Sequence, residues 1–132
     1  MKYLKTFENK FNESDVNNIL DQISIFLNSN DNRRWIGNDA ISIYIRKSKR
    51  SFNGQIYDFF DFATIETTKT GTGLFTQILK RFEEIYPDKN IYIESVLTDR
   101  FANYIKNVLG FEDEDEMNIG KNFYKIKNII TL

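Results

Sequence analysis

The dipeptide Asn53-Gly54 separates two segments with β-strand patterns, and no other feature of the chain constrains its fold as strongly. Asn-Gly is the preferred sequence of two-residue hairpin turns, because both central positions need a positive φ angle. Before the turn, isoleucine occupies every second position of residues 41–45, as in a strand with one buried face. After the turn, residues 55–65 carry apolar side chains at both parities, which is typical of a central strand covered on both faces. The sequence therefore predicts an antiparallel hairpin at the centre of a sheet.

Helices and further strands are predicted before and after this hairpin. Helices follow from apolar residues at helical spacing in three segments: 12–27, 74–86 and 99–109. Strands follow from alternating or β-branched stretches in three more: 91–97, 112–119 and 122–130. Asn12 is in position to cap the first helix, and Gly110 to end the third. We expect an α/β (α+β) fold with a mixed, mostly antiparallel central sheet flanked by helices, in a single domain of residues 1–132.

The residue types that the chain lacks restrict its chemistry. It has no histidine and no cysteine, which excludes histidine bases, thiolate nucleophiles, disulfides and metal sites built from these residues. We therefore expect no metal site, and acid–base chemistry falls to carboxylates, tyrosine, lysine or water. The formal net charge of −1 argues against a nucleic-acid partner. The chain has no apolar run near the roughly 20 residues of a membrane helix and no signal-peptide pattern, so we expect no membrane partner and a cytoplasmic location.

The chain between the central strand and the second helix reads Lys69-Thr70-Gly71-Thr72-Gly73. The two glycines let the backbone turn tightly and present N–H groups without crowding by Cβ atoms. At the N-terminus of a helix, free N–H donors and the positive end of the helix dipole favour a phosphate group. Lys69 and the two threonine hydroxyls add further donors. An ordinary turn from a strand to a helix has the same composition, so the loop alone leaves both interpretations open.

This loop and the segments after it resemble the core of the GNAT superfamily of acyl-CoA N-acyltransferases. The resemblance rests on a strand that runs into the glycine loop, a helix directly after it, the strand 91–97, the helix 99–109 and the turn Gly110-Phe111. The resemblance covers residues 55–130, and the chain is especially similar to small GNAT-like proteins encoded by bacteriophages. It implies a sheet that splays apart between the family's fourth and fifth strands. It also implies acetyl-CoA, or another acyl-CoA, as co-substrate.

The resemblance assigns candidate binding residues and shows two departures from the family pattern. It puts the pyrophosphate of acyl-CoA on five residues: Lys69, Thr70, Gly71, Thr72 and Gly73. It puts the pantetheine arm against the backbone near Thr64 and Ile65, between the splayed strands. Thr68 occupies a position where glutamine or arginine is usual, and Lys106 one where a tyrosine often protonates the leaving thiolate. Tyr104, two residues before Lys106, faces nearly the opposite side of the helix.

The resemblance implies an N-acyltransferase, and an acetyltransferase in the first instance. In this reaction the amine of a small molecule, a protein or a modified nucleotide attacks the thioester directly. A carboxylate has to take up the proton of the amine. Glu94 is the first candidate, because a position between Tyr92 and Val96 on one face of a central strand partly removes it from water. Glu66, at the end of the preceding strand, is the second candidate. Structural interpretations remain open for both residues: a carboxylate bound to Tyr92 or the backbone for Glu94, and an exposed charge for Glu66.

Other charged segments have less specific interpretations. Asp58 and Asp61, on the central strand, are weaker candidates for the base. The basic run 46–50 predicts a solvated hairpin, with a contact to the adenosine 3′-phosphate of CoA or to a nucleic-acid substrate as the functional alternatives. Trp35, next to two arginines, predicts partial cover of the core, with stacking on a ligand ring as the alternative.

A second class of function fits the same residues. The departures at Thr68 and Lys106 favour a GNAT-shaped binding protein without catalysis, such as a bacteriophage factor that docks on a host or virion protein in the host cytoplasm. The intact glycine loop and the carboxylate of Glu94 favour the enzyme. Monomer and homodimer both stay open, since the apolar end 129–132 is suited to pairing across a dimer interface.

Overall fold

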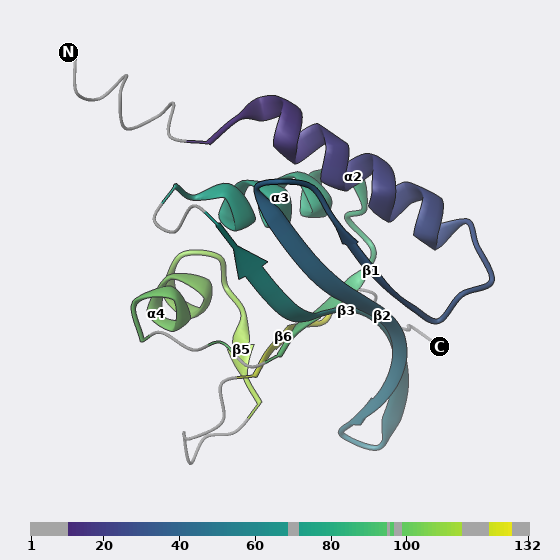
Figure 1. The fold of residues 1–132 in the computed structure, drawn as a ribbon. Helices are drawn as coiled ribbons and strands as arrows, with labels where there is room; N and C mark the ends of the chain where they lie inside the picture. Colours follow the sequence, from purple (N-terminus) through teal and green to yellow (C-terminus); the bar gives the residue numbers. More distant parts are fainter. Residues whose placement is uncertain (1–10, 69–71, 95, 97–98, 115–121, 128–132) are drawn as a thin grey trace.

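The computed structural model describes residues 11–68, 72–94, 96, 99–114 and 122–127 (Figure 1). Three helices lie in this part of the chain: α2 (Glu13–Leu27), α3 (Leu74–Ile85) and α4 (Asp99–Asn107). Six strands lie there as well: β1 (Arg33–Gly37), β2 (Ile41–Phe52), β3 (Gln55–Thr67), β4 (Asn90–Ile93), β5 (Glu112–Asp113) and β6 (Phe123–Lys125). No helix within these described ranges is long and apolar enough to cross a membrane.

The six strands form one sheet in the order β1-β2-β3-β4-β6-β5. β3 and β4 run parallel, with Phe59 opposite Asn90 and Phe62 opposite Ile93. The other neighbouring strands run antiparallel. Helix α3 lies in the connection between the two parallel strands, as a crossover of this kind requires. The predicted α/β (α+β) class, a mixed and mostly antiparallel sheet flanked by helices, is confirmed.

The hairpin predicted from Asn53-Gly54 is confirmed. Asn53 and Gly54 have φ angles of 52° and 81°. Both angles are positive, as a type I′ turn requires. From this turn, β2 and β3 pair residue for residue as far as Ile45 and Phe62. The tip of the hairpin projects beyond the rest of the sheet, at the end away from α2 and α3 (Figure 1).

A β-bulge at Ala63 interrupts this register. The residues opposite Phe62 and Thr64 are direct neighbours in β2, which leaves Ala63 without an opposite residue. One extra residue shifts the alternation of a strand, so side chains an odd number of positions apart come to share a face. Phe62 and Ile65 both pack in the hydrophobic core for this reason. The bulge accounts for part of the apolar pattern at both parities.

Helices α2 and α3 cover one face of the sheet, which we call the helix face (Figure 1). Its core is aromatic. The ring centroid of Phe60 lies 6.2 Å from that of Phe26 in α2 and 4.7 Å from that of Phe82 in α3. Phe62 lies 5.5 Å from the same Phe82 ring, and all four side chains are buried. We call the opposite face, which carries charged and aromatic side chains, the polar face.

Helix α4 packs beside α3 through Phe101, whose ring centroid lies 5.8 Å from that of Phe75. Ile105, one turn further along α4, is fully buried. Gly110 follows the helix with a φ of 79°, in the left-handed region that glycine adopts readily. The Phe111 N–H then donates to the Ile105 carbonyl at 3.0 Å. The turn predicted at Gly110-Phe111 is confirmed.

Two strands differ from the prediction. The strand expected over 91–97 ends at Ile93, and Val96 joins the hydrophobic core. Val96 therefore does not continue the alternation that was expected to put it beside Glu94. β1 was not predicted, because Ile36 is its one buried apolar residue and gives no visible alternation. The closing hairpin is present as the antiparallel pair β5 and β6, shorter within the described residues than predicted.

Candidate functional site

The glycine loop joins β3 to α3. Lys69, Thr70 and Gly71 lie outside the described residues, and Thr72 is half-buried. Gly73 is the N-cap of α3 and has a φ of 79°. Apart from its two chain neighbours, a Cβ atom built at Gly73 would meet no heavy atom of the described residues within 4 Å, so the space beside it is open in this part of the chain. The positive φ favours glycine, because most residues with a Cβ atom are strained there.

The N-terminus of α3 differs from that of α2. In α2, the side chain of Asn12 caps the Ser14 N–H at 2.9 Å, as predicted for this residue, and Glu13 and Asp15 lie in the first turn. In α3, the N-cap is a glycine without a capping side chain, and the first turn has no acidic residue. Acidic side chains in the first turn offset the positive end of the helix dipole. The start of α3 therefore keeps the electrostatic character that binds an anion.

β3 runs past its parallel partner toward this loop. The Glu94 N–H donates to the Phe62 carbonyl at 3.0 Å, one step beyond the last paired residues of β3 and β4. Thr64 and Glu66 lie further along β3 and are exposed, and Ile65 between them is half-buried. Within the described residues, these three positions pair with β2 and with no strand on the other side. Among the described residues, the edge of β3 on the side of β4 is therefore open there.

Glu94 forms an ion pair with Arg46 of β2. The Nη2 atom of Arg46 lies 3.1 Å and 3.0 Å from the two carboxylate oxygens of Glu94. Each of the two side chains is 30% exposed. Burial lowers the pKa of Arg46, but the hydrogen bonds and charges of Glu94 and Asp61 outweigh it and raise this pKa above its ordinary value. The partner of the Glu94 carboxylate is thus a permanent cation rather than Tyr92, which the structural interpretation had named.

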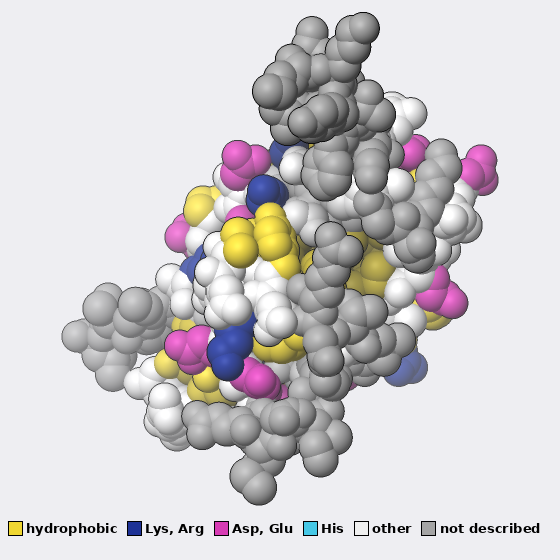
Figure 2. Space-filling view, turned by 90° about the vertical axis from the view of Figure 1, so that its left-hand side faces the viewer, with side chains coloured by type: hydrophobic (Ala, Val, Ile, Leu, Met, Phe, Trp, Pro, Cys, Tyr) yellow, Lys and Arg dark blue, Asp and Glu magenta, His cyan; other side chains and the backbone are white. Residues whose placement is uncertain are grey.

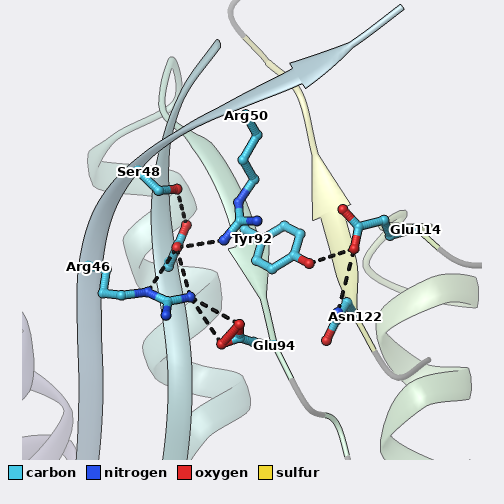
Figure 3. A network of polar contacts seen from close by, with 8 residues as sticks. Arg46, Ser48, Arg50, Tyr92, Glu94, Glu114 and Asn122 are labelled. Carbon is cyan, nitrogen blue, oxygen red and sulfur yellow. Dashed lines mark hydrogen bonds and ion pairs between the residues drawn. The ribbon is translucent and has the colours of Figure 1, made fainter. Parts of the chain in front are cut away.

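Asp61 of β3 is fully buried on the polar face. It accepts hydrogen bonds from Ser48 Oγ at 2.8 Å, Arg50 Nη2 at 2.9 Å and Arg46 Nε at 3.2 Å. Figure 3 shows Arg46, Ser48 and Arg50 pointing from one strand into the same cluster. The prediction of a solvated hairpin over residues 46–50 is wrong for these three residues, because they alternate onto the face where Asp61 lies.

Tyr92 of β4 completes the cluster. The guanidinium carbon of Arg50 lies 3.5 Å from its ring centroid, and its hydroxyl donates to Glu114 Oε1 at 2.6 Å (Figure 3). Burial raises the pKa of Tyr92, and the hydrogen bond to Glu114 raises it further, so the phenol stays protonated. The buried Arg50 Nε has no hydrogen-bond partner in the part of the chain that the structure describes. The tyrosine ring beneath it gives the guanidinium a cation–π contact instead.

The register of the hairpin is the sequence signal that could have revealed this cluster. A two-residue turn sets the pairing of both strands, and counting back from it residue for residue puts Arg46 opposite Asp61. The same counting puts Lys49 opposite Asp58, and these two form an exposed ion pair at 2.6 Å. Charge complementarity across the hairpin thus distinguishes Asp61, the centre of the cluster, from Asp58, a surface charge.

Comparisons with known proteins give no independent indication of function. No family model and no curated protein matches the chain. Function is therefore inferred from the two features above: the start of α3 and the polar face. Among the described residues, no three acidic, histidine or cysteine side chains gather where they could hold a metal ion. On the side shown in Figure 2, the lysine and arginine side chains drawn in colour lie apart and form no extended basic patch.

A hollow of about 630 Å³ lies at the other end of the parallel strands. It is lined by the end of α2, the middle of β2, the first half of β3 and residues 88–90, which lead into β4. Ligands of open sheets with parallel strands bind beyond the carboxyl ends of those strands. This hollow lies at their amino ends, beside Asp58 and Asn90. We therefore assign the candidate site to the glycine loop and the polar face.

Proposed function

We propose that the chain is an acyl-CoA-dependent N-acyltransferase of the GNAT superfamily, which transfers an acetyl or other acyl group to an amine. The junction of β3 and α3 carries the proposal. There a strand of the parallel pair leads to a helix whose N-cap is the left-handed Gly73, with open space beside it and no acid in its first turn. Helix starts of this kind bind phosphate through their N–H groups and dipole.

Each part of acyl-CoA has candidate partners in the chain. For the pyrophosphate these are the loop residues, of which the first three lie outside the described part: Lys69, Thr70, Gly71, Thr72 and Gly73. For the pantetheine arm it is the open edge of β3 near Thr64 and Ile65. Backbone N–H and C=O groups at such an edge need hydrogen-bond partners, which the amides of the arm supply.

Glu94 is the proposed proton acceptor, with Glu66 at the exposed end of β3 as the second candidate. The ammonium form of the acceptor gives its proton to the carboxylate, because only the neutral nitrogen is a nucleophile. The nitrogen then attacks the thioester carbonyl, the C–N bond forms and the C–S bond breaks. The CoA sulfur leaves with the electron pair of that bond. The acylated nitrogen releases its excess proton, which passes through water to this sulfur, so that the products are the amide and the free thiol. Glu94 has to separate from Arg46 before it can act in this way.

Titration calorimetry with acetyl-CoA tests the proposal. We expect a dissociation constant in the micromolar range for the wild type. Gly73→Glu should weaken binding by about 100-fold or more, because it puts a carboxylate against the pyrophosphate. Gly54→Glu is a matched control: Gly54 has a φ of 81° and the same open surroundings, but it lies in the hairpin turn. This variant should bind acetyl-CoA as the wild type does.

The outcomes separate three situations. Equal binding by wild type and Gly73→Glu contradicts the assignment of the loop. Loss of binding in both variants shows that the strain of a side chain at a positive φ, and not the site, is responsible. Where acetyl-CoA binds, release of free thiol after addition of amines distinguishes an enzyme from a protein that only binds the co-substrate.

One observation favours the second candidate, a binding protein of this fold without catalysis. The hydroxyl of Thr68 lies 3.1 Å from the Asp39 carbonyl and 3.2 Å from the Ala40 carbonyl, where it donates. The side chain that replaces the family's glutamine or arginine is thus bound to the segment before β2 and does not extend toward a phosphate. No binding of acetyl-CoA, CoA or longer acyl-CoAs at millimolar concentration would decide for this candidate.

A further inference from the structure

The cluster on the polar face has a fixed part and an exposed part. Asp61 is 0% exposed and holds Arg46 and Arg50 at 3.2 Å and 2.9 Å. A carboxylate so enclosed does not exchange its partners with a ligand. Glu94 and Arg46 are each 30% exposed, and their ion pair lies where a ligand can reach it. The Arg46–Glu94 pair is therefore the exchangeable element of the cluster.

The charges of the cluster explain what such an exchange requires. In their direct ion pairs, the two positive charges of Arg46 and Arg50 are balanced by Asp61 and Glu94. Glu114 adds a further negative charge to the cluster through its hydrogen bond with the Tyr92 hydroxyl. Taking Glu94 away from Arg46 leaves this partly buried guanidinium with Asp61 alone, a counter-ion that it shares with Arg50, which is unfavourable. A ligand carboxylate that replaces Glu94 on Arg46 restores the balance and makes a charge-assisted hydrogen bond. The released Glu94 then offers its own charge to a cation.

We propose that the acceptor is a free amino acid, or a similar small amine with a carboxylate close to its nitrogen. The carboxylate of the acceptor takes the place of Glu94 on Arg46, and its ammonium group binds the released Glu94. Figure 3 shows the ion pair that opens in this exchange. The inference rests on the proposed acyltransferase function and names the substrate class of that site. Simple amines and the side-chain amines of proteins lack the neighbouring carboxylate. They have to compete with Arg46 for Glu94 and leave the guanidinium with Asp61 as its remaining ion-pair partner.

The same exchange links recognition to proton transfer. While Glu94 is bound to Arg46, both of its oxygens are occupied by the guanidinium. After the exchange, the carboxylate lies against the ammonium group of the acceptor and accepts one of its protons, which leaves a neutral amine. An acceptor with a carboxylate thus frees its own base, whereas an acceptor without one does not.

Trp35 provides a reporter for binding at this face. It is the single tryptophan of the chain and is 53% exposed. Its ring centroid lies 5.2 Å from that of Tyr44, which precedes Arg46 by two residues and lies on the same face of β2. A ligand that binds beside Arg46 changes the surroundings of these rings, and the fluorescence of Trp35 should follow it.

The test compares four amino acids with their α-amides: glycine, L-alanine, L-leucine and L-lysine. Each is titrated into the full chain, without CoA and in the presence of CoA, and binding is followed by the fluorescence of Trp35. At least one acid should bind about ten-fold more tightly than its amide, since the amide cannot replace Glu94 on Arg46. Equal affinities in all four pairs, or no binding of any acid, would overturn the inference.

Two variants and a control locate the effect. Arg46→Gln should abolish the preference for the acid, whereas Lys49→Gln should keep it, because Lys49 is 73% exposed and paired with Asp58 on the same hairpin. Arg46→Gln also leaves Asp61 with one guanidinium fewer, so Glu94→Gln serves as the second variant. The Glu94→Gln variant frees Arg46 but has no carboxylate for the ammonium group of the ligand. It should therefore bind the N-acetyl derivative of an amino acid, which has a carboxylate but no ammonium group, about as tightly as the free amino acid. A preserved preference for the free amino acid in Glu94→Gln contradicts the exchange.

These measurements do not depend on acetyl-CoA, so the two proposals fail separately. A chain that binds acetyl-CoA but shows no preference for the acids keeps the proposed function and refutes this inference. A chain that prefers the acids but binds no acyl-CoA supports recognition of amino acids at Arg46 and Glu94 and contradicts acyl transfer.

Discussion

The two faces of β3 are buried by different means. Phe60 and Phe62 point to the helix face, where aromatic rings of α2 and α3 enclose them. Asp61, between them in sequence, points to the polar face and is equally inaccessible, with an exposure of 0%. The phenylalanines are held by apolar contact alone, and the aspartate by a hydroxyl and two guanidinium groups.

This difference separates stability from chemistry across one strand. The helix face buries apolar rings, and such burial is the main favourable contribution to folding. The polar face arranges charges whose net contribution to stability is small, because burial of ions opposes their attraction. Its value lies in the fixed positions of Arg46 and Glu94 at a surface that a ligand can reach. Substitutions on the helix face should therefore mainly lower stability, whereas those at the exposed part of the polar face should mainly affect ligand binding and chemistry.

Truncation on the helix face should have the largest effect. Phe62→Ala removes a ring that contacts Phe60, Phe75 and Phe82, and should lower the free energy of unfolding by about 4 kcal/mol. Urea denaturation measures this loss. Ile56→Ala, on the same strand but 65% exposed, should change it by less than about 0.5 kcal/mol. Equal losses in the two variants would show that β3 is not packed against the helices as described.

Neutralising the buried charge of the polar face should have the second largest effect. Asp61→Asn keeps the shape of the side chain but removes the ion pair of Arg50 and leaves Arg46 with Glu94 alone. It should lower the free energy of unfolding by about 3 kcal/mol. Asp58→Asn is the matched control, because Asp58 is 82% exposed and its pair with Lys49 contributes at most about 1 kcal/mol. Chemical denaturation of both variants at low and high salt measures the difference. A loss in Asp58→Asn as large as in Asp61→Asn would remove the distinction between buried and surface charge.

The helix face could be predicted from the sequence because its signals are periodic. Helical spacing identified the apolar stripes of α2 and α3, and the Asn-Gly turn identified the hairpin between β2 and β3. These signals depend on neighbours along the chain, which the sequence displays directly. The end of β4 at Ile93 and the position of β1 were missed, because both depend on pairing with strands distant in sequence.

The polar face could be predicted only in part, because it depends on register. Glu94 was a candidate from its place on a central strand, but its partner Arg46 lies 48 residues away in the chain. Asp61 was ranked below Glu94, although the hairpin turn already puts it opposite Arg46. The bulge at Ala63 also shifts the pairing register of β2 and β3, and the periodicity of the sequence does not predict this shift. The loop residues 69–71, outside the described part of the chain, remain a prediction.

Loss of the Tyr92 hydroxyl should have a smaller effect, and one that depends on pH. Tyr92→Phe removes the hydrogen bond to Glu114 and should lower the free energy of unfolding by about 1.5 kcal/mol at pH 8. Burial and this hydrogen bond raise the pKa of Tyr92 in the folded protein above its ordinary value near 10. The phenol therefore ionises first in the unfolded chain, so its contribution is complete below pH 10 and is lost as the pH rises further.

The difference between wild type and Tyr92→Phe should accordingly shrink by about 1.4 kcal/mol from pH 9 to pH 11. Urea denaturation of both proteins across this range measures it, and the other tyrosines and lysines cancel because both proteins carry them. Tyr44→Phe is the control, since Tyr44 is half-buried on the same face. A gap that stays constant with pH would show that Tyr92 titrates alike in the folded and unfolded chains.

The smallest effect on stability should come from the exposed member of the cluster. Glu94→Gln leaves Arg46 bound to Asp61, and at 30% exposure the freed guanidinium is reached by water, so the free energy of unfolding should fall by less than about 1 kcal/mol. If Glu94 is the proton acceptor, the same variant should lower the turnover of acyl transfer about 100-fold or more while acetyl-CoA binds as before. Asp61→Asn should differ from Glu94→Gln in its larger loss of stability. Full turnover of Glu94→Gln at neutral pH would move the role of base to Glu66 or to water. A loss of stability in Glu94→Gln as large as that in Asp61→Asn would mean that the Arg46–Glu94 pair is structural and does not open for a ligand.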